Sequence, residues 1–70
     1  MPVINYNTVA GALSSEQKEA LTQAITNAVG EVLGDKIKKN AWVIINESPE
    51  GNFAIGGHQL TAAGLKKLMN

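Results

Sequence analysis

The sequence predicts a small α/β (α+β) protein made of one strand–helix–strand unit followed by a short hairpin. Three observations support this fold class. Residues 3–9 alternate as a strand does, residues 14–33 carry apolar side chains three and four positions apart, and residues 41–46 form a nearly continuous apolar run. Because a helix of about twenty residues joins the two strands, we expect them to pair in parallel through a right-handed crossover.

The first predicted strand has the sequence VINYNTV, rich in β-branched and aromatic residues. Its alternation places Asn5 and Asn7 on the same face as Val3 and Val9. Gly11 is expected to end this part of the chain.

The predicted helix runs from Ser14 to about Leu33. Ser14 and Gln17 have the spacing of a capping box, and Gly34 is well placed as the left-handed residue that ends a helix. Lys18 belongs to the polar side, which we expect to face solvent. The apolar stripe consists of Leu21, Ile25, Ala28, Val29 and Val32.

The second strand follows a polar connection, DKIKKN at residues 35–40, which holds three of the six lysines. The next segment, AWVIIN at 41–46, is apolar at positions that point to both faces of a strand. It is therefore predicted to be covered on both sides.

The last third of the chain begins with a turn marked by Pro49 and Gly51. The pair Gly56-Gly57 then predicts a tight reversal and a small hairpin. The tail, residues 58–70, fits either a short helix or an extended arm, and its periodicity does not decide between them.

Length and composition exclude several classes of function. Seventy residues suit one small domain, residues 1–70, with a core that needs support from self-association. A net charge of zero, no arginine and three aromatic residues do not fit a nucleic-acid binder. No apolar run approaches the roughly 20 residues of a membrane span, so we expect a soluble cytoplasmic protein. The absence of cysteine, with a single histidine, argues against disulfides and metal sites.

Three further features are interpreted as structural. GNFAIGG is not a phosphate-binding loop, because Gly57 and His58 stand where such a loop needs Lys and Ser or Thr. No serine, cysteine or aspartate has a triad spacing to His58, which favours an exposed loop histidine. Lys36, Lys38 and Lys39 are most simply a solvated loop, although one of them could reach an anion across a subunit boundary.

The order of these motifs resembles the 4-oxalocrotonate tautomerase family over residues 2–57. The strongest match is IINESPEGNFAIGG, from Ile44 to Gly57, and SSEQKEAL at residues 14–21 supports it. The resemblance implies a β-α-β protomer that pairs into four-stranded dimers, with three dimers making a homohexamer. It also implies a tautomerase that acts on a small-molecule enol or keto acid without a cofactor.

Pro2 is the candidate catalytic residue. Removal of Met1 would turn its nitrogen into a free secondary amine, a base that no side chain supplies. An α-amine has an ordinary pKa of about 7.7–8.0, and burial in an apolar pocket lowers it towards neutrality, where the amine can both take and return a proton. The resemblance implies that Pro2 is the general base and that Phe53 is an aromatic wall of its pocket.

The chain departs from the family at the positions that bind anionic substrates. Family members that act on dicarboxylates use two arginines, which fall here at Ala12 or Leu13 and at Trp42. Tryptophan cannot form the bidentate contact that an arginine makes with a carboxylate. Dehalogenase relatives need an acidic residue where this chain has Ile55, so water activation is not expected. Trp42 and Phe53 remain the candidate substrate-binding residues.

These observations lead to a tautomerase that transfers a proton between enol and keto forms of a 2-hydroxydienoate or an aryl enolpyruvate. Two alternatives stay open. One is a non-catalytic or assembly subunit of the same fold that has lost the arginine anion site. The other is a Pro2-dependent enzyme for a more apolar carbonyl substrate, on which Trp42 stacks.

Overall fold

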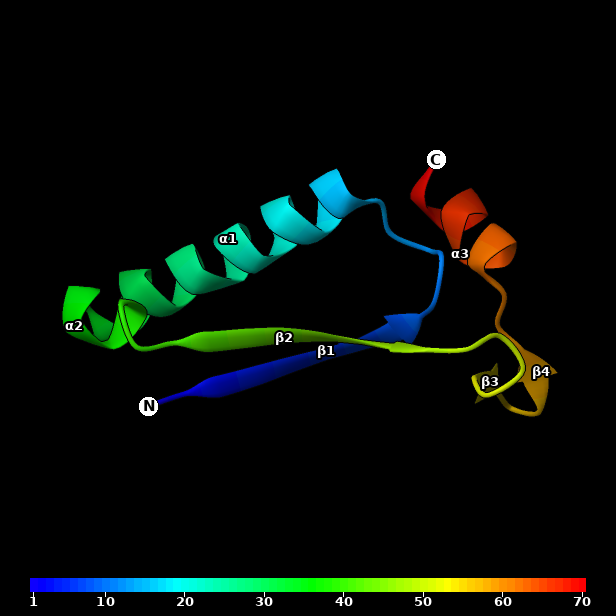
Figure 1. The fold of residues 1–70 in the computed structure, drawn as a ribbon, viewed down its shortest axis with the longest axis horizontal. Helices are drawn as coiled ribbons and strands as arrows, with labels where there is room; N and C mark the ends of the chain where they lie inside the picture. Colours follow the sequence, from blue (N-terminus) through cyan, green and yellow to red (C-terminus); the bar gives the residue numbers. More distant parts are fainter.

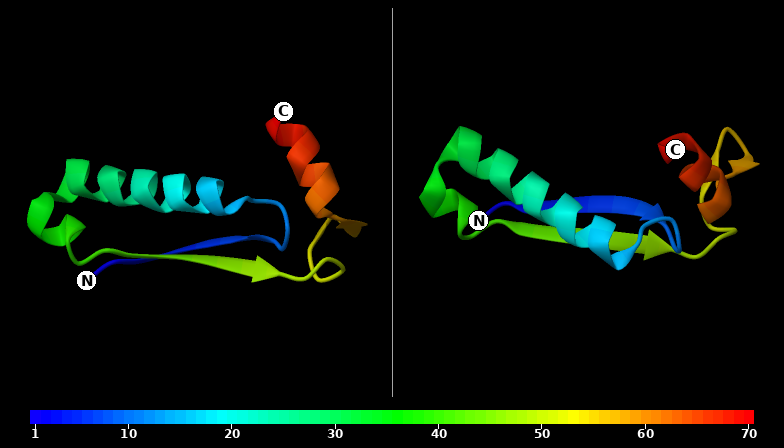
Figure 2. Two further views of the ribbon diagram at one scale, coloured as in Figure 1. Left: turned by 45° about the horizontal axis from the view of Figure 1, so that its top comes forward. Right: turned by 90° about the horizontal axis from the view of Figure 1, so that it is seen from above.

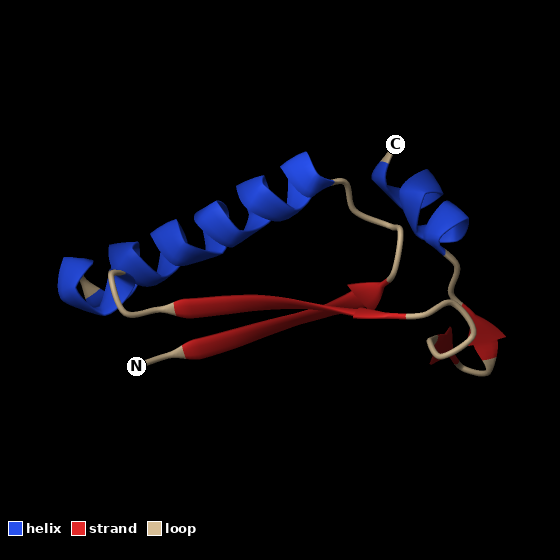
Figure 3. Cartoon of the chain, in the orientation of Figure 1, coloured by secondary structure: helices blue, strands red, loops and turns tan.

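A computed structural model describes residues 1–70. Helix α1 lies along one face of a two-stranded sheet, and a small hairpin and the last helix lie beyond one end of that sheet (Figures 1 and 3). This arrangement confirms the predicted β-α-β unit followed by a hairpin. The elements are β1 (Val3–Val9), α1 (Ser15–Leu33), α2 (Asp35–Lys38), β2 (Trp42–Ser48), β3 (Ala54–Ile55), β4 (His58–Gln59) and α3 (Ala62–Met69).

Strands β1 and β2 pair in parallel, as predicted. The register runs from Val3 opposite Trp42 to Val9 opposite Ser48. The second strand is therefore longer than the apolar run at 41–46, because the polar residues at its end continue the ladder beside β1. The sheet has two strands, so each strand keeps one edge without a hydrogen-bonded neighbour.

The two faces of the sheet differ in cover. Helix α1 lies over one face, on which Val43 and Ile45 are half-buried (Figure 2). On the other face Trp42 and Ile44 are 56% and 39% exposed. We call this second face the open face. We expected the AWVIIN strand to be covered on both faces. In the single chain only the face under α1 is covered, because the chain has no second layer that could cover the open face.

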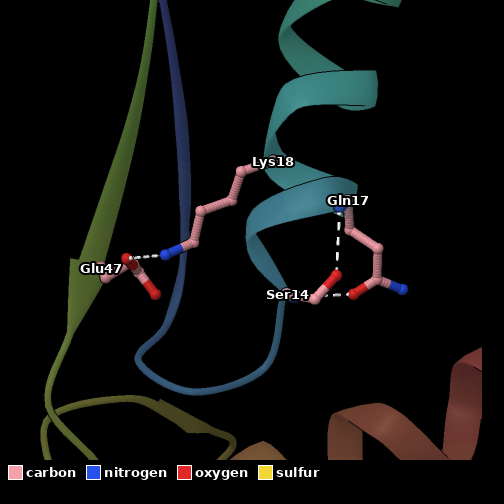
Figure 4. Close-up of polar contacts among 4 residues, drawn as sticks. All are labelled: Ser14, Gln17, Lys18 and Glu47. Atoms are coloured by element: carbon pink, nitrogen blue, oxygen red, sulfur yellow. Dashed lines mark hydrogen bonds and ion pairs between the residues drawn. The ribbon is translucent and has the colours of Figure 1, made fainter.

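The predicted capping box starts α1 (Figure 4). The Ser14 hydroxyl accepts a hydrogen bond from the Gln17 backbone N–H at 3.1 Å, and the Gln17 side-chain oxygen accepts one from the Ser14 N–H at 2.9 Å. Two of the N–H groups that a helix start leaves unpaired are satisfied in this way.

The polar connection predicted at 35–40 contains a short helix, α2, so Lys36 and Lys38 lie on a helix and not in the expected loop. Gly34 ends α1 with φ 94° and ψ 167°, so its φ is positive as expected, but the extended ψ leads the chain directly into α2. The two helices meet closely, since a Cβ built on Gly30 would lie 2.6 Å from Cδ of Lys38. Four residues are too few for a helical period to be visible in the sequence.

The hairpin forms where the glycine pair predicts it. Strands β3 and β4 pair antiparallel, with Ala54 opposite Gln59, and Gly56 and Gly57 between them have φ values of 56° and 83°. Positive φ at both central residues is the geometry of the tight turns that suit hairpins.

The tail forms helix α3, which settles the choice between a helix and an arm. The Thr61 hydroxyl caps it by accepting the Gly64 N–H at 3.0 Å. The Glu50 carboxylate accepts the Ala62 N–H at 2.8 Å and ties the start of α3 to the turn after β2.

The core of the single chain is small. Only Thr8, Val9 and Ala12 are buried, all at the end of β1 or in the loop that follows it. A two-stranded sheet with one covering helix and so few buried residues is marginal by itself. This supports the prediction that copies of the chain associate.

One ion pair ties α1 to the sheet near the end of β2. The Lys18 Nζ lies 2.6 Å from Oε1 of Glu47, so Lys18 does not point freely into solvent as the helical pattern suggested (Figure 4). The hydrogen bond from Lys18 lowers the pKa of Glu47 below its ordinary value. A residue at the margin of the polar stripe can reach the neighbouring strand because its side chain is long.

We expect Glu47→Gln to reduce the sensitivity of the fold to acid. A carboxylate whose pKa is lower in the folded state stabilises that state above its unfolded pKa, and the effect is lost as pH falls through the folded pKa. The variant should therefore lose a small part of its thermal stability near pH 7 and show a smaller further loss at about pH 3 than the parent protein. Thermal unfolding at both pH values measures this, with Glu31→Gln as a control because Glu31 makes no ion pair. Identical acid sensitivity in parent and variant would contradict it.

Candidate active site

Pro2 and Trp42 lie side by side at the start of the sheet. Pro2 directly precedes β1, and its carbonyl oxygen accepts the Trp42 backbone N–H at 2.9 Å. This hydrogen bond is part of the parallel pairing of Val3 with Trp42, the first pair of the ladder. Pro2 is half-buried, and the indole of Trp42 is largely exposed on the open face. The sheet therefore brings together two of the three predicted site residues.

Phe53 lies at the opposite end of the molecule. Trp42 is the first residue of β2 and Phe53 follows the end of this strand, whose seven residues span about 23 Å. The Phe53 carbonyl oxygen accepts the Leu60 N–H at 2.8 Å and so helps to close the hairpin. The N-terminus and the hairpin lie at opposite ends in Figure 1 and in both views of Figure 2. Within one chain, Phe53 does not reach Pro2.

The positions that correspond to the two arginines of dicarboxylate-specific family members carry no charge in this chain. Ala12 is 1% exposed, in the loop between β1 and α1, and its N–H bonds the Val9 carbonyl oxygen at 3.3 Å. The adjacent Leu13 is half-buried. At the other position, Trp42 offers an aromatic face without a positive charge.

Three lysines lie at the same end of the molecule as Pro2. Lys36 and Lys38 belong to α2, and Lys39 caps it, next to the start of β2 (Figure 1). The other three lysines lie elsewhere, one on α1 in the ion pair with Glu47 and two on α3. A positive charge near Pro2 in this chain would therefore have to come from the α2 region.

The hollows of the single chain do not coincide with the predicted site. A shallow polar hollow between α1 and α2 is lined by Thr26, Asp35, Lys38 and Lys39. A second hollow lies along the first turns of α1. Since neither contains Pro2, Trp42 or Phe53, one chain does not enclose these residues in a pocket.

The remaining candidate residues are placed as follows. His58 is exposed as expected but lies on β4 and not in a loop, and Ile55 is 66% exposed on β3. No group of three histidine, cysteine, aspartate or glutamate side chains is arranged to hold a metal ion. None of the helices is both long enough and apolar enough to span a membrane.

The structure contains one side-chain cluster that was not predicted from the sequence. Asn46 of β2 hydrogen-bonds both Asn5 and Asn7 of β1. The alternation of β1 had placed Asn5 and Asn7 on one face, but the parallel register is needed to bring Asn46 beside them.

The sequence profile of a family described as tautomerase enzymes matches residues 2–63. The chain belongs to the tautomerase family. The match extends six residues beyond Gly57, the last residue of the sequence resemblance, and includes the start of α3.

Individual relatives cover almost the whole of this tautomerase. It is 36% identical over 64 residues to 2-hydroxymuconate tautomerase from Stutzerimonas stutzeri, covering 91% of this chain and 98% of the relative. It is 34% identical over 61 residues to a probable tautomerase from Bacillus cereus, covering 87% and 97% of the two chains.

Solved structures agree with this assignment. The tautomerase matches a crystal structure of apo unfused 4-oxalocrotonate tautomerase with a TM-score of 0.74 and 36% identity, covering 84% of this chain and 93% of that one. TomN, a 4-oxalocrotonate tautomerase homologue in the tomaymycin biosynthetic pathway, matches with a TM-score of 0.73 and 31% identity, covering 83% and 86%. Membership of the 4-oxalocrotonate tautomerase family supports an isomerase-type tautomerase activity.

Proposed function

We propose that this chain is a cofactor-independent tautomerase in which Pro2 is the general base. The observation that carries the proposal is the position of Pro2 in a tautomerase-family chain. It stands directly before β1, held by the 2.9 Å hydrogen bond from the Trp42 N–H. That bond uses the carbonyl oxygen of Pro2, so the nitrogen of Pro2 takes no part in the hydrogen bonds of the sheet.

The chemistry requires removal of Met1, because a proline nitrogen within a peptide bond is an amide and does not accept a proton. Met1 is 73% exposed, so the bond to Pro2 is accessible to an aminopeptidase. The freed amine takes the proton from the enol oxygen, and the electron pair of that O–H bond forms the carbonyl. The carbon–carbon double bond then takes the same proton back from the amine, so that a C–H bond replaces the O–H bond.

The proposed substrate is a 2-hydroxydienoate or an aryl enolpyruvate. Trp42, beside Pro2, would cover the apolar or aromatic tail, and a lysine from the α2 region would face the carboxylate. Phe53 can line the same pocket if it comes from another copy of the chain, because its own Pro2 lies at the other end of the sheet.

The same geometry supports a homo-oligomer of this one-domain chain, and the cytoplasm remains our proposed location for it. Two unpaired strand edges and an exposed sheet face are available for contacts between copies. We propose four-stranded dimers, three of which form a hexamer.

The protein without Met1 is the material for the functional test. Conversion of phenylenolpyruvate and of 2-hydroxymuconate to their keto forms can be followed by ultraviolet absorbance. We expect turnover well above the buffer-catalysed rate, with the aryl monoacid accepted at least as well as the dicarboxylate. A protein that is folded and assembled but accelerates neither reaction would contradict the proposal.

The absence of arginine at both family positions favours one alternative function. Ala12 is buried and Trp42 is uncharged, so a subunit of this fold could keep the assembly and lack the anion site. Such a subunit would show no activity that depends on Pro2, which distinguishes it from the enzyme.

A further inference from the structure

Three asparagines form a hydrogen-bonded cluster in the middle of the open face. Asn46 Nδ2 donates to Asn5 Oδ1 at 3.1 Å and to Asn7 Oδ1 at 3.0 Å. Asn46 lies opposite Asn7 in the parallel register, and all three side chains are exposed. They lie on the side of the sheet away from α1, whose ion pair reaches Glu47 on the other face.

The cluster is left with unpaired donors and an unpaired acceptor. A side-chain amide has two N–H donors and an oxygen with two lone pairs. The NH₂ groups of Asn5 and Asn7 have no protein partner, and neither has the side-chain oxygen of Asn46. The cluster therefore offers both donors and an acceptor to whatever covers it, and a second identical cluster would match it.

Apolar side chains lie next to the cluster on the same face. Val3, Trp42 and Ile44 are 52%, 56% and 39% exposed. Burying these side chains is favourable, but it removes water from the amides as well. A buried amide without a partner is costly, so contacts that mismatch donors and acceptors are disfavoured relative to those that match them.

The occupant that fits this face is a second copy of the chain. The single chain buries only three residues, so its own core is small. The open face belongs to the surface that association with another copy could bury. Two seven-residue strands present a face of only about 200 Å², whereas a stable interface covers about 800 Å² per partner. Another copy supplies both a matching cluster and open strand edges that enlarge the contact.

We propose that the cluster of Asn5, Asn7 and Asn46 sets the register between copies of this chain. The apolar neighbours supply attraction between copies, and the amides restrict how the copies fit together. The proposal rests on the homo-oligomer proposed above and is independent of the role of Pro2.

The first test compares Asn46→Asp with Asn27→Asp. The first change removes the two donors of Asn46 and places a negative charge on the open face, whereas Asn27 lies on α1 and bonds Gln23. We expect Asn46→Asp to raise the concentration at which the oligomer dissociates by about tenfold or more in sedimentation velocity, and Asn27→Asp to leave it unchanged. Equal dissociation in the two variants would overturn the proposal.

A second variant separates attraction from register. The triple change Asn5→Leu, Asn7→Leu and Asn46→Leu keeps the branched shape of each side chain and removes every amide. It should still associate but give several masses where the parent gives one. A single mass equal to that of the parent would show that the cluster does not set the register.

A labelling measurement tests whether the open face is covered in the assembled protein. The chain has no cysteine, so Asn7→Cys and Asn27→Cys each introduce one thiol. In the assembled protein we expect a maleimide to react with position 7 about tenfold or more slowly than with position 27, and the two rates to converge on dissociation. Equal rates in the assembled protein would overturn the proposal.

Discussion

Replacement of Pro2 by alanine, in protein that lacks Met1, is expected to lower kcat/KM for enol–keto conversion by about 10²–10⁴-fold, the usual contribution of a positioned general base. Alanine leaves a primary amine, which is more mobile than the ring nitrogen of proline. The amine is then held less firmly against the substrate, and proton transfer loses its geometry. Stopped-flow or ultraviolet assays with phenylenolpyruvate measure the effect.

Two comparisons show whether the loss of activity is caused by the change at the nitrogen of Pro2. Pro49→Ala changes the other proline of the chain, in the turn after β2, and should leave kcat unchanged. Protein that retains Met1 has an amide at Pro2 and should be inactive while keeping its fold. If Pro2→Ala and the Met1-retaining form both equal the parent enzyme, Pro2 is not the base and the assembly-subunit alternative is favoured.

Replacement of Trp42 by arginine is expected to raise kcat/KM for 2-hydroxymuconate by about 10–10²-fold. A charge-assisted hydrogen bond to a carboxylate contributes about 1.5–3 kcal/mol, and each ~1.4 kcal/mol changes a rate tenfold. Without both arginines, the parent should be about 10²–10⁴-fold weaker on a dicarboxylate than an enzyme that has them. The gain with phenylenolpyruvate should be smaller, since the substitution also removes the aromatic surface beside Pro2.

The control for this variant is Trp42→Gln, which removes the indole without adding charge. It should lower activity on the aryl substrate and give no gain on the dicarboxylate. A parent enzyme that already prefers the dicarboxylate strongly would contradict the prediction. In that case Lys36, Lys38 or Lys39, which lie at the same end of the molecule, would be the source of the positive charge.

The backbone elements that depend on nearby residues could be predicted from the sequence. The capping box is a contact between residues three apart, so Ser14 and Gln17 identify the start of α1 directly. Gly56 and Gly57 identify the hairpin because they adopt positive φ without steric cost. The parallel pairing of β1 and β2 follows from the length of the helix between them.

The two short helices could not be predicted in this way. Helix α2 has four residues, too few to show a period, and its contact with α1 depends on the space above Gly30. Helix α3 has a hydroxyl cap at Thr61, but its apolar residues are spread among small ones and gave no decisive pattern.

The order of elements, the parallel pairing of the two strands and the resemblance to the tautomerase family could be derived from the sequence. The tertiary structure decided which side chains meet. Register brings Asn46 to Asn5 and Asn7, the strand length separates Phe53 from Pro2, and a long side chain joins Lys18 to Glu47. Local signals act between residues a few positions apart, whereas these relations join residues about 30 to 50 positions apart along the chain, and only the packing of strand against strand and helix against sheet fixes them.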